Sequence, residues 1–183
     1  MGEDVFAGLT WLLEHASELG VDAGRVAIMG DSAGGGIAAS VALLARDRNV
    51  NLAKQILVYP MLDDRNTEPN PSLAPFLTWT YDNNFTGWSA VLGEDLGSEN
   101  VSPVAAPARL EDFRGVAPAY IEVGELDVFR DEAIAYGQHL ALADIPIELH
   151  VHYGAPHGFE HSAPSSRLAM RAMGDRMRAL VSI

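Results

Sequence analysis

The chain has 183 residues, 48% hydrophobic and 20% charged, which favours a single globular domain with a sizeable core. The formal net charge of −13 disfavours a partner that presents a phosphate backbone, so we expect no nucleic-acid partner. Because the chain contains no cysteine, disulfides, thiolate metal sites and a cysteine nucleophile are excluded.

The first twenty residues are acidic and have the spacing of an amphipathic helix, whereas a signal peptide would begin with basic residues followed by a longer apolar block. No stretch of the sequence approaches the roughly 18 consecutive apolar residues that a membrane span needs. We therefore expect a cytoplasmic protein with no membrane span.

Apolar residues at helical spacing predict a first helix over residues 4–19, which Gly20 can end. The next run, 25–30, is short, apolar and bounded by turn residues, so it predicts a buried strand. The remaining elements are predicted by the same criteria: a helix over 33–47, a strand over 54–60, a loop over 63–75, one or two aromatic-rich helices over 76–93, a strand over 118–124, a helix over 131–143, a strand over 145–154 and a helix over about 164–181.

Strands that alternate with helices predict an α/β fold, with a mainly parallel sheet covered by helices on both faces. The predicted strands are nearly continuous apolar runs, as expected for strands buried on both faces. In such sheets the reactive groups gather at the carboxyl ends of the strands. The candidate site residues are therefore sought there.

Ser32 follows the first predicted strand and precedes a helix, within the sequence Gly30-Asp31-Ser32-Ala33-Gly34. A G-x-S-x-G sequence between a strand and a helix forms a strained turn that holds the serine hydroxyl out above the sheet. We expect a Cβ at either flanking glycine to crowd this turn. The helix N-terminus favours developing negative charge, so the Ala33 amide is a candidate oxyanion donor. A glycine-rich turn that merely lets the helix pack closely on the sheet is the structural alternative.

A serine nucleophile needs a histidine base, which in turn needs a carboxylate to orient it. Of the six histidines, only His157 is predicted to lie in a loop just past a strand end and beside a glycine, and His161 is the reserve candidate. The carboxylate is expected between the serine and the histidine in the chain, which leaves Glu125 and Asp127 after the third strand. Spacing alone does not separate these two, whereas helix capping accounts for the next acidic pair, Asp131 and Glu132.

Five short segments occur in this order along the chain: GDSAGG (30–35), YPMLD (59–63), SPVAAP (102–107), DVFRDE (127–132) and HGF (157–159). Together they resemble the hormone-sensitive-lipase-like family (family IV) of carboxylesterases in the α/β-hydrolase superfamily. The resemblance covers nearly the whole chain. It implies that Ser32 is the nucleophile, His157 the base and Asp127 the acid, although Val128 stands where the family often has proline.

The family also has a His-Gly-Gly-Gly segment well before the nucleophile, whose amides complete the oxyanion hole, and this sequence contains no such segment. The resemblance therefore implies residues 1–183 to be one α/β-hydrolase domain that lacks the family's N-terminal strands. We expect a low rate, because the loss of one oxyanion donor costs about 10²–10³ in turnover. The uncovered strand 25–30 is expected to pair with a second copy of the chain, unless the chain is a fragment of a longer product.

The resemblance implies that residues 63–100 form a cap and pocket segment. Apolar side chains in this segment are candidates to line an acyl site for short- to medium-chain esters, and packing between helices is the structural alternative. The residues predicted to bind substrate are Asp31, Phe76, Leu77, Trp79 and Trp88, and Phe85 is a further candidate lining residue.

The predicted function is hydrolysis of a small carboxylic ester by a Ser-His-Asp triad through an acyl-enzyme, with no cofactor and no metal. The main alternative is a non-catalytic binding module that keeps the triad without a complete oxyanion hole. A peptidase of the same fold would keep the same residue order. A metal site built from His150, His152, His157 and His161 is a further alternative, since two histidines on one face of a strand could chelate a metal ion.

Overall fold

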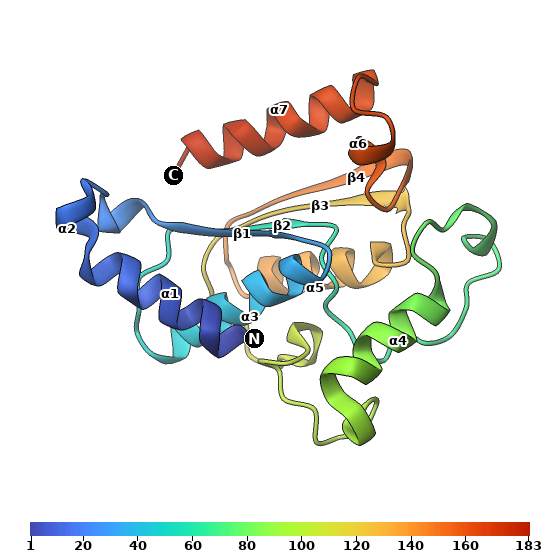
Figure 1. Ribbon diagram of the computed structural model, residues 1–183, viewed down its shortest axis with the longest axis horizontal. Helices are drawn as coiled ribbons and strands as arrows, with labels where there is room; N and C mark the ends of the chain where they lie inside the picture. Colours follow the sequence, from blue (N-terminus) through green and yellow to red (C-terminus); the bar gives the residue numbers. More distant parts are fainter.

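The computed structural model describes all 183 residues and contains one sheet of four parallel strands in the order β1-β2-β3-β4 (Figure 1). The strands are β1 (Ala27–Asp31), β2 (Lys54–Val58), β3 (Ala119–Leu126) and β4 (Ile147–Pro156). Every pairing is parallel, in accord with the chain order of strands and helices. The predicted α/β fold is confirmed.

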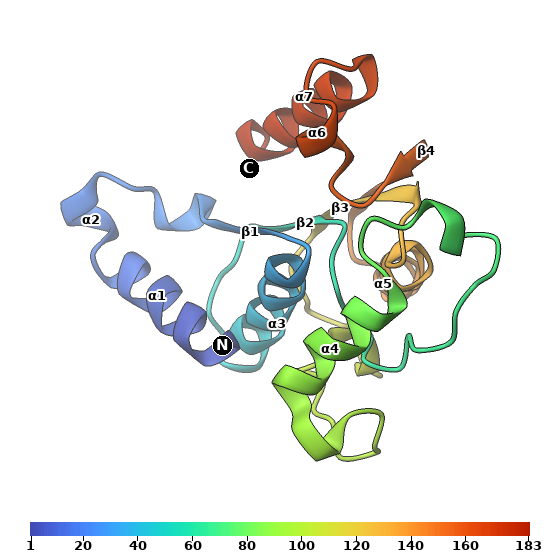
Figure 2. The same cartoon turned by 45° about the vertical axis from the view of Figure 1, so that its right-hand side comes forward.

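Helices connect and cover the strands. They are α1 (Gly2–Glu14), α2 (Ala16–Leu19), α3 (Ala33–Asp47), α4 (Tyr81–Leu92), α5 (Arg130–Leu142), α6 (Phe159–Ser162) and α7 (Arg167–Val181), with short 3₁₀ turns at Ala23–Arg25, Ala74–Phe76, Gly93–Asp95 and Pro107–Arg109. Helices α3 and α5 lie on one face of the sheet and α7 on the other, and α1 packs outside α3 (Figures 1 and 2). The sheet is therefore the middle of three layers.

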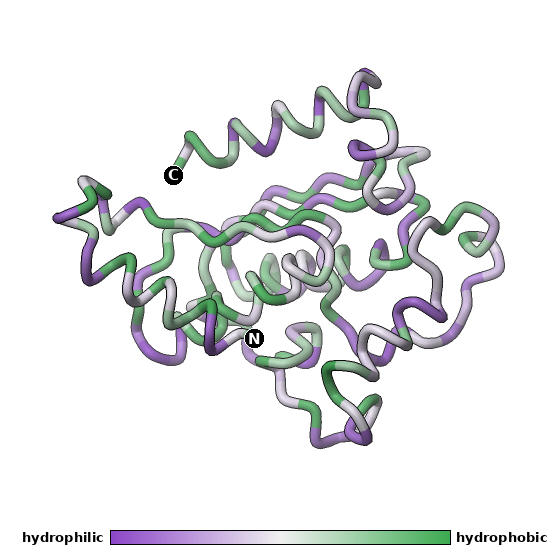
Figure 3. Tube along the Cα trace, viewed as in Figure 1, coloured by the Kyte–Doolittle hydropathy of each residue, from purple (hydrophilic) through white to green (hydrophobic).

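The main core lies between the sheet and the layer formed by α3 and α5. The inner strands β2 and β3 are almost wholly buried, and the largest cluster of buried apolar residues is built around them and α3. Figure 3 shows the same pattern as hydrophobic segments along the central strands and α3. The prediction that all four strands are buried on both faces is wrong for β1 and β4, which lie at the two edges and are partly exposed.

The long connection from β2 to β3 contains a second, smaller apolar cluster. It joins Trp88 of α4 to Met61, and also includes Phe129, which lies just before α5. Leu77 and Trp79 pack against it from the loop before α4. This cluster holds the 63–100 segment against the carboxyl ends of the strands, beside the candidate site.

The predicted first helix, 4–19, is broken in two at His15. The His15 ring Nδ1 lies 2.8 Å from the carbonyl oxygen of Trp11, which also accepts the His15 backbone amide. Helix α2 then ends at Gly20, which adopts the left-handed conformation at its C-cap as predicted. None of the helices combines the length and apolar character that a transmembrane segment requires.

Candidate active site

Ser32 lies between the end of β1 and the start of α3, with φ 55° and ψ −122°, a conformation that side chains rarely adopt. Its amide donates to the carbonyl oxygen of Val58 and its carbonyl accepts from the amide of Met61, so the end of β2 holds the turn in place. Backbone strain that the surroundings hold in place is typical of functional residues.

Glycines make this turn possible, though not all those predicted. A Cβ on Gly30 would lie 2.1 Å from the carbonyl oxygen of Gly34, so no larger residue fits there. The crowding predicted at Gly34 is wrong, because a Cβ there would meet only a side-chain atom at an ordinary 3.7 Å. The other close positions are Gly35 and Gly36, where α3 packs against Pro60 and Met61.

Ser32, His157 and Asp127 form one hydrogen-bonded row, although they lie far apart in the chain. The Ser32 Oγ is 3.0 Å from the Nε2 of His157, and the Nδ1 of His157 is 2.8 Å from the Oδ2 of Asp127. Each residue follows a different strand: β1, β3 or β4. These are the contacts that a serine nucleophile, an imidazole base and an orienting carboxylate require.

The structure separates the two carboxylates between which spacing could not choose. The Asp127 side chain is fully buried, and its other oxygen, Oδ1, accepts from the backbone amide of Phe129 at 3.0 Å. Glu125 points elsewhere, and its Oε2 accepts from the backbone amide of Gly154. Of these two carboxylates, only Asp127 contacts the His157 imidazole.

Three residues that sequence reasoning missed surround His157. The rings of Tyr59 and Phe129 meet the imidazole edge to face, with centroids 4.6 and 5.2 Å away. The Thr78 hydroxyl donates to the His157 carbonyl at 2.8 Å. Tyr59 was within reach of sequence reasoning because it lies in the YPMLD segment at the end of the predicted strand 54–60, whereas nothing in the sequence pattern singles out Thr78.

The start of α3 presents backbone amides beside Ser32. Ala33 is the first residue of this helix, and the geometry of an α-helix leaves the amide at that position without an intrahelical acceptor. The positive end of the helix dipole adds to the same effect. The Ala33 amide can thus donate to an acceptor placed beside the Ser32 hydroxyl.

A mainly apolar groove of about 330 Å³ begins at Ala33 and runs between α1, α3 and α4. Its lining includes Ile37, Met61, Trp88 and Val91. The groove adjoins the turn that carries Ser32, and it has room for a small apolar group.

Of the residues predicted to bind substrate, only Trp88 lines this groove. Leu77 and Trp79 pack into the smaller apolar cluster, and Phe76 and Phe85 are exposed to solvent. Asp31 faces a different hollow, which it shares with Tyr59 and Glu160. For Leu77 and Trp79, helix packing accounts for the observed contacts.

Glu132 departs from the expectation of a simple helix-capping residue. It is buried under the loop after β2, and its Oε1 accepts from the amides of Leu62 and Asp63 while its Oε2 accepts from the Asn66 side chain. Burial raises the pKa of Glu132 to about 8, with these donors opposing the shift. Glu132 therefore joins α5 to the loop that carries the YPMLD segment.

The three other histidines considered for the base or for a metal site lie apart from Ser32. His150 lies 2.6 Å from Glu148, and the buried His152 lies 3.5 Å from Glu122. His161 is in α6, where its Nε2 is 3.5 Å from the Tyr59 hydroxyl. None of these three contacts Ser32 in a hydrogen bond, and His157 alone does.

Comparison with known proteins shows to which family the chain is similar. Residues 2–161 match the model of a family described as having the alpha/beta hydrolase fold. Esterase LipI of Mycobacterium tuberculosis is 40% identical over 164 residues, which are 86% of this chain and 49% of that protein. Carboxylesterase NlhH of the same species is 34% identical over 182 residues, which are 97% of this chain and 57% of that protein.

The solved structures agree. A bacterial heroin esterase superposes with a TM-score of 0.90 at 36% identity, over 98% of this chain and 58% of that one. The chain thus spans about half the length of the relatives that it matches. With the motifs, the parallel sheet and these matches together, the chain belongs to the α/β-hydrolase fold family, in its hormone-sensitive-lipase-like group.

Proposed function

We propose that this chain carries the nucleophile, base and acid of a serine carboxylesterase. The observation that supports the proposal most directly is the row of contacts from the Ser32 hydroxyl through His157 to the buried Asp127. The relatives named esterase or carboxylesterase support the same reaction class. A carboxylic ester is therefore the proposed substrate.

In the proposed reaction, the Ser32 Oγ attacks the ester carbonyl while His157 Nε2 takes the hydroxyl proton. The oxyanion accepts a hydrogen bond from the Ala33 amide, and Asp127 stabilises the imidazolium through Nδ1. His157 then gives the proton to the departing alkoxide, which leaves an acyl-Ser32. Water, deprotonated by His157, then attacks this acyl group. The bond to Ser32 Oγ breaks, His157 returns the proton to Oγ, and the carboxylic acid is released.

The size and lining of the groove beside Ala33 suggest which esters would fit. At about 330 Å³, with walls from Ile37, Met61 and Trp88, it suits a short or medium acyl chain and is small for a long lipid. We propose short- to medium-chain esters as the substrate class.

Covalent labelling tests the nucleophile directly. A fluorophosphonate probe should label the wild-type protein at Ser32, and Ser32→Ala should remove the label. His157→Ala should slow labelling by at least about 10²-fold, because the hydroxyl loses its base. Equal labelling of wild type and Ser32→Ala, or no labelling of folded wild-type protein, would contradict the proposal.

Hydrolysis of a short activated ester then separates an enzyme from a non-catalytic module that keeps the triad. Turnover that His157→Ala abolishes supports the enzyme. A rate equal to the buffer background, in a protein that the probe still labels, would favour the binding module. An amide of the same acyl group, assayed in parallel, would reveal a peptidase.

A further inference from the structure

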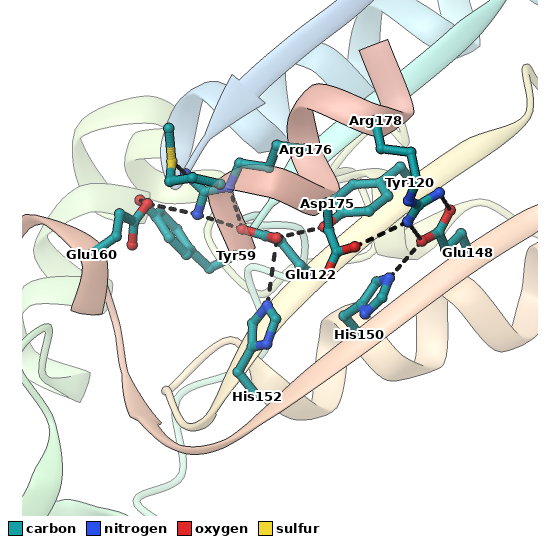
Figure 4. A network of polar contacts seen from close by, with 11 residues as sticks. Tyr59, Tyr120, Glu122, Glu148, His150, His152, Glu160, Asp175, Arg176 and Arg178 are labelled. Carbon is teal, nitrogen blue, oxygen red and sulfur yellow. Dashed lines mark hydrogen bonds and ion pairs between the residues drawn. The ribbon is translucent and has the colours of Figure 1, made fainter. Parts of the chain in front are cut away.

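A network of buried polar residues connects the C-terminal helix α7 to Tyr59 (Figure 4), and Tyr59 lies beside His157 of the candidate site. The Arg176 guanidinium of α7 contacts two carboxylates, Glu122 of β3 and Glu160 of α6. Glu160 Oε1 in turn accepts from the Tyr59 hydroxyl at 2.8 Å. All four side chains are buried, and none of them belongs to the row formed by Ser32, His157 and Asp127.

Within this polar network, Tyr59 is the residue that contacts the His157 imidazole. Its ring meets the His157 ring edge to face with centroids 4.6 Å apart. Phe129 packs against the same imidazole, also edge to face. The position of the Tyr59 ring therefore limits where the imidazole can lie relative to Ser32.

The backbone of Tyr59 is held in an unfavourable conformation, with φ 37°. For a bulky residue a positive φ is a genuine outlier, and such strain persists only where the surroundings determine it. Here the Tyr59 amide donates to the Glu122 carbonyl, at 2.6 Å, while the phenol is fixed by Glu160. Both ends of this residue are thus tied to residues that Arg176 contacts.

The charges in this polar network fix the direction of the hydrogen bond from the Tyr59 hydroxyl to Glu160. Burial and the neighbouring Glu160 raise the pKa of Tyr59, so the phenol keeps its proton and donates it. Burial opposes ionisation of Glu160, but hydrogen bonds, among them those from Tyr59 and Arg176, outweigh it and lower the pKa of Glu160. The acceptor therefore stays a carboxylate.

An arrangement of this kind contributes little to stability by itself, because the desolvation of three buried charged groups offsets much of their attraction. Its geometric effect is larger, because buried charge-assisted hydrogen bonds hold their partners in one arrangement. Glu160 lies only three residues after His157, so the same contacts also fix the segment that follows the base.

We propose that Tyr59 is a positioning residue for His157, and that Glu160 and Arg176 hold it in place from α6 and α7. The inference rests on the proposed function in one respect, since it takes His157 to be the base. Tyr59 does not react. It keeps the imidazole aligned between Ser32 and Asp127, and the C-terminal helix thereby supports the site from outside the groove.

Two variants test the inference, with one matched control. Tyr59→Phe keeps the ring and removes the hydroxyl that Glu160 accepts, and Glu160→Gln keeps an acceptor oxygen and removes the charge. The control is Tyr120→Phe, because Tyr120 is an equally buried tyrosine that donates to Glu122 at 2.7 Å and does not contact His157. Urea unfolding of each protein first establishes that the variant is folded.

The first measurement is steady-state hydrolysis of a short activated ester. Tyr59→Phe should lower kcat about tenfold and change KM less than about twofold, because misalignment of the base affects the chemical step more than binding. Glu160→Gln should act in the same direction and Tyr120→Phe should change neither constant by more than about twofold. Equal loss of kcat in Tyr59→Phe and Tyr120→Phe would overturn the inference.

The second measurement does not depend on turnover. The ¹³C–¹H signals of the His157 ring, assigned by their loss in His157→Ala, should shift or broaden in Tyr59→Phe and Glu160→Gln and stay in place in Tyr120→Phe. Unchanged signals in both test variants would overturn the inference even if the protein hydrolyses esters. Shifted signals in a protein without esterase activity would refute the proposed function and leave the positioning role supported.

Discussion

Ser32, His157 and Asp127 show how single residues set the geometry of the candidate site. Ser32 adopts its strained turn because Gly30 allows the Gly34 carbonyl to come close, and Asp127 is buried with one oxygen on the Phe129 amide and the other on the imidazole. A buried carboxylate with both oxygens engaged has one orientation. That orientation in turn holds Nε2 of His157 towards the Ser32 hydroxyl.

At this scale the two acidic candidates make a sharp comparison. Asp127→Asn should lower kcat for ester hydrolysis by about 10³- to 10⁴-fold, because the amide favours the wrong imidazole tautomer. Glu125→Gln should change kcat by less than about threefold, since Glu125 only accepts the Gly154 amide. Steady-state kinetics on one ester measures both effects. A larger loss of kcat in Glu125→Gln than in Asp127→Asn would show that Asp127 is not the acid.

Neighbouring elements meet around the site through a few buried polar contacts. Helix α5 reaches the loop after β2 through Glu132, whose two oxygens accept three donors from residues 62–66. The Asn66 side chain also donates to the carbonyl of Val128, the residue that follows Asp127. These contacts tie the YPMLD segment to the turn that carries Asp127.

The raised pKa of Glu132 makes this junction depend on pH. Burial brings its pKa to about 8 in the folded protein from an ordinary value of 4.5. The folded state therefore binds the proton more tightly than the unfolded state. The stabilisation is complete below about pH 4.5 and is lost as the pH rises towards 8, by at most about 1.4 kcal/mol per pH unit.

Glu132→Gln removes this titration. The free energy of unfolding of the wild type, relative to that of Glu132→Gln, should fall steadily between pH 5 and pH 8. Urea unfolding of both proteins at unit steps of pH measures the difference. Parallel pH profiles for the two proteins would show that Glu132 does not titrate in this range.

The whole molecule is a three-layer domain with an unpaired strand at each edge of its sheet. Strand β1 lies at one edge, and Met29 in its middle is 44% exposed. An unpaired edge with apolar side chains is a template for pairing with another chain. The expected self-association through residues 25–30 therefore stays a prediction, now with a specific residue to change.

Sedimentation velocity over a range of protein concentrations tests this association. The wild type should associate as its concentration rises, and Met29→Lys should weaken the association at least about tenfold, because a charge at a strand edge opposes pairing. Leu142→Lys is the matched control, since Leu142 is an exposed apolar residue at the end of α5. A monomeric wild type, or equal effects of the two variants, would contradict pairing through β1.

Local patterns in the sequence were sufficient for the order of strands and helices, the strand–turn–helix around Ser32 and the choice of His157, because each depends on residues close together in the chain. Helix α3 occupies its predicted 33–47 range, and most other boundaries move by one to three residues. The resemblance, rather than spacing, favoured Asp127 over Glu125. The edge positions of β1 and β4 and the contacts of the 63–100 segment depend on neighbours distant in sequence.

Tertiary structure alone decided how the site is supported. Tyr59 against His157, Glu160 and Arg176 behind Tyr59, and Glu132 beneath the loop after β2 are contacts between side chains far apart in the chain. No periodicity or motif encodes such pairs, because burial and hydrogen bonding are properties of the packed sheet and its helices. The sequence alone thus indicated the three residues of the candidate site, and packing determined which groups hold these residues in line.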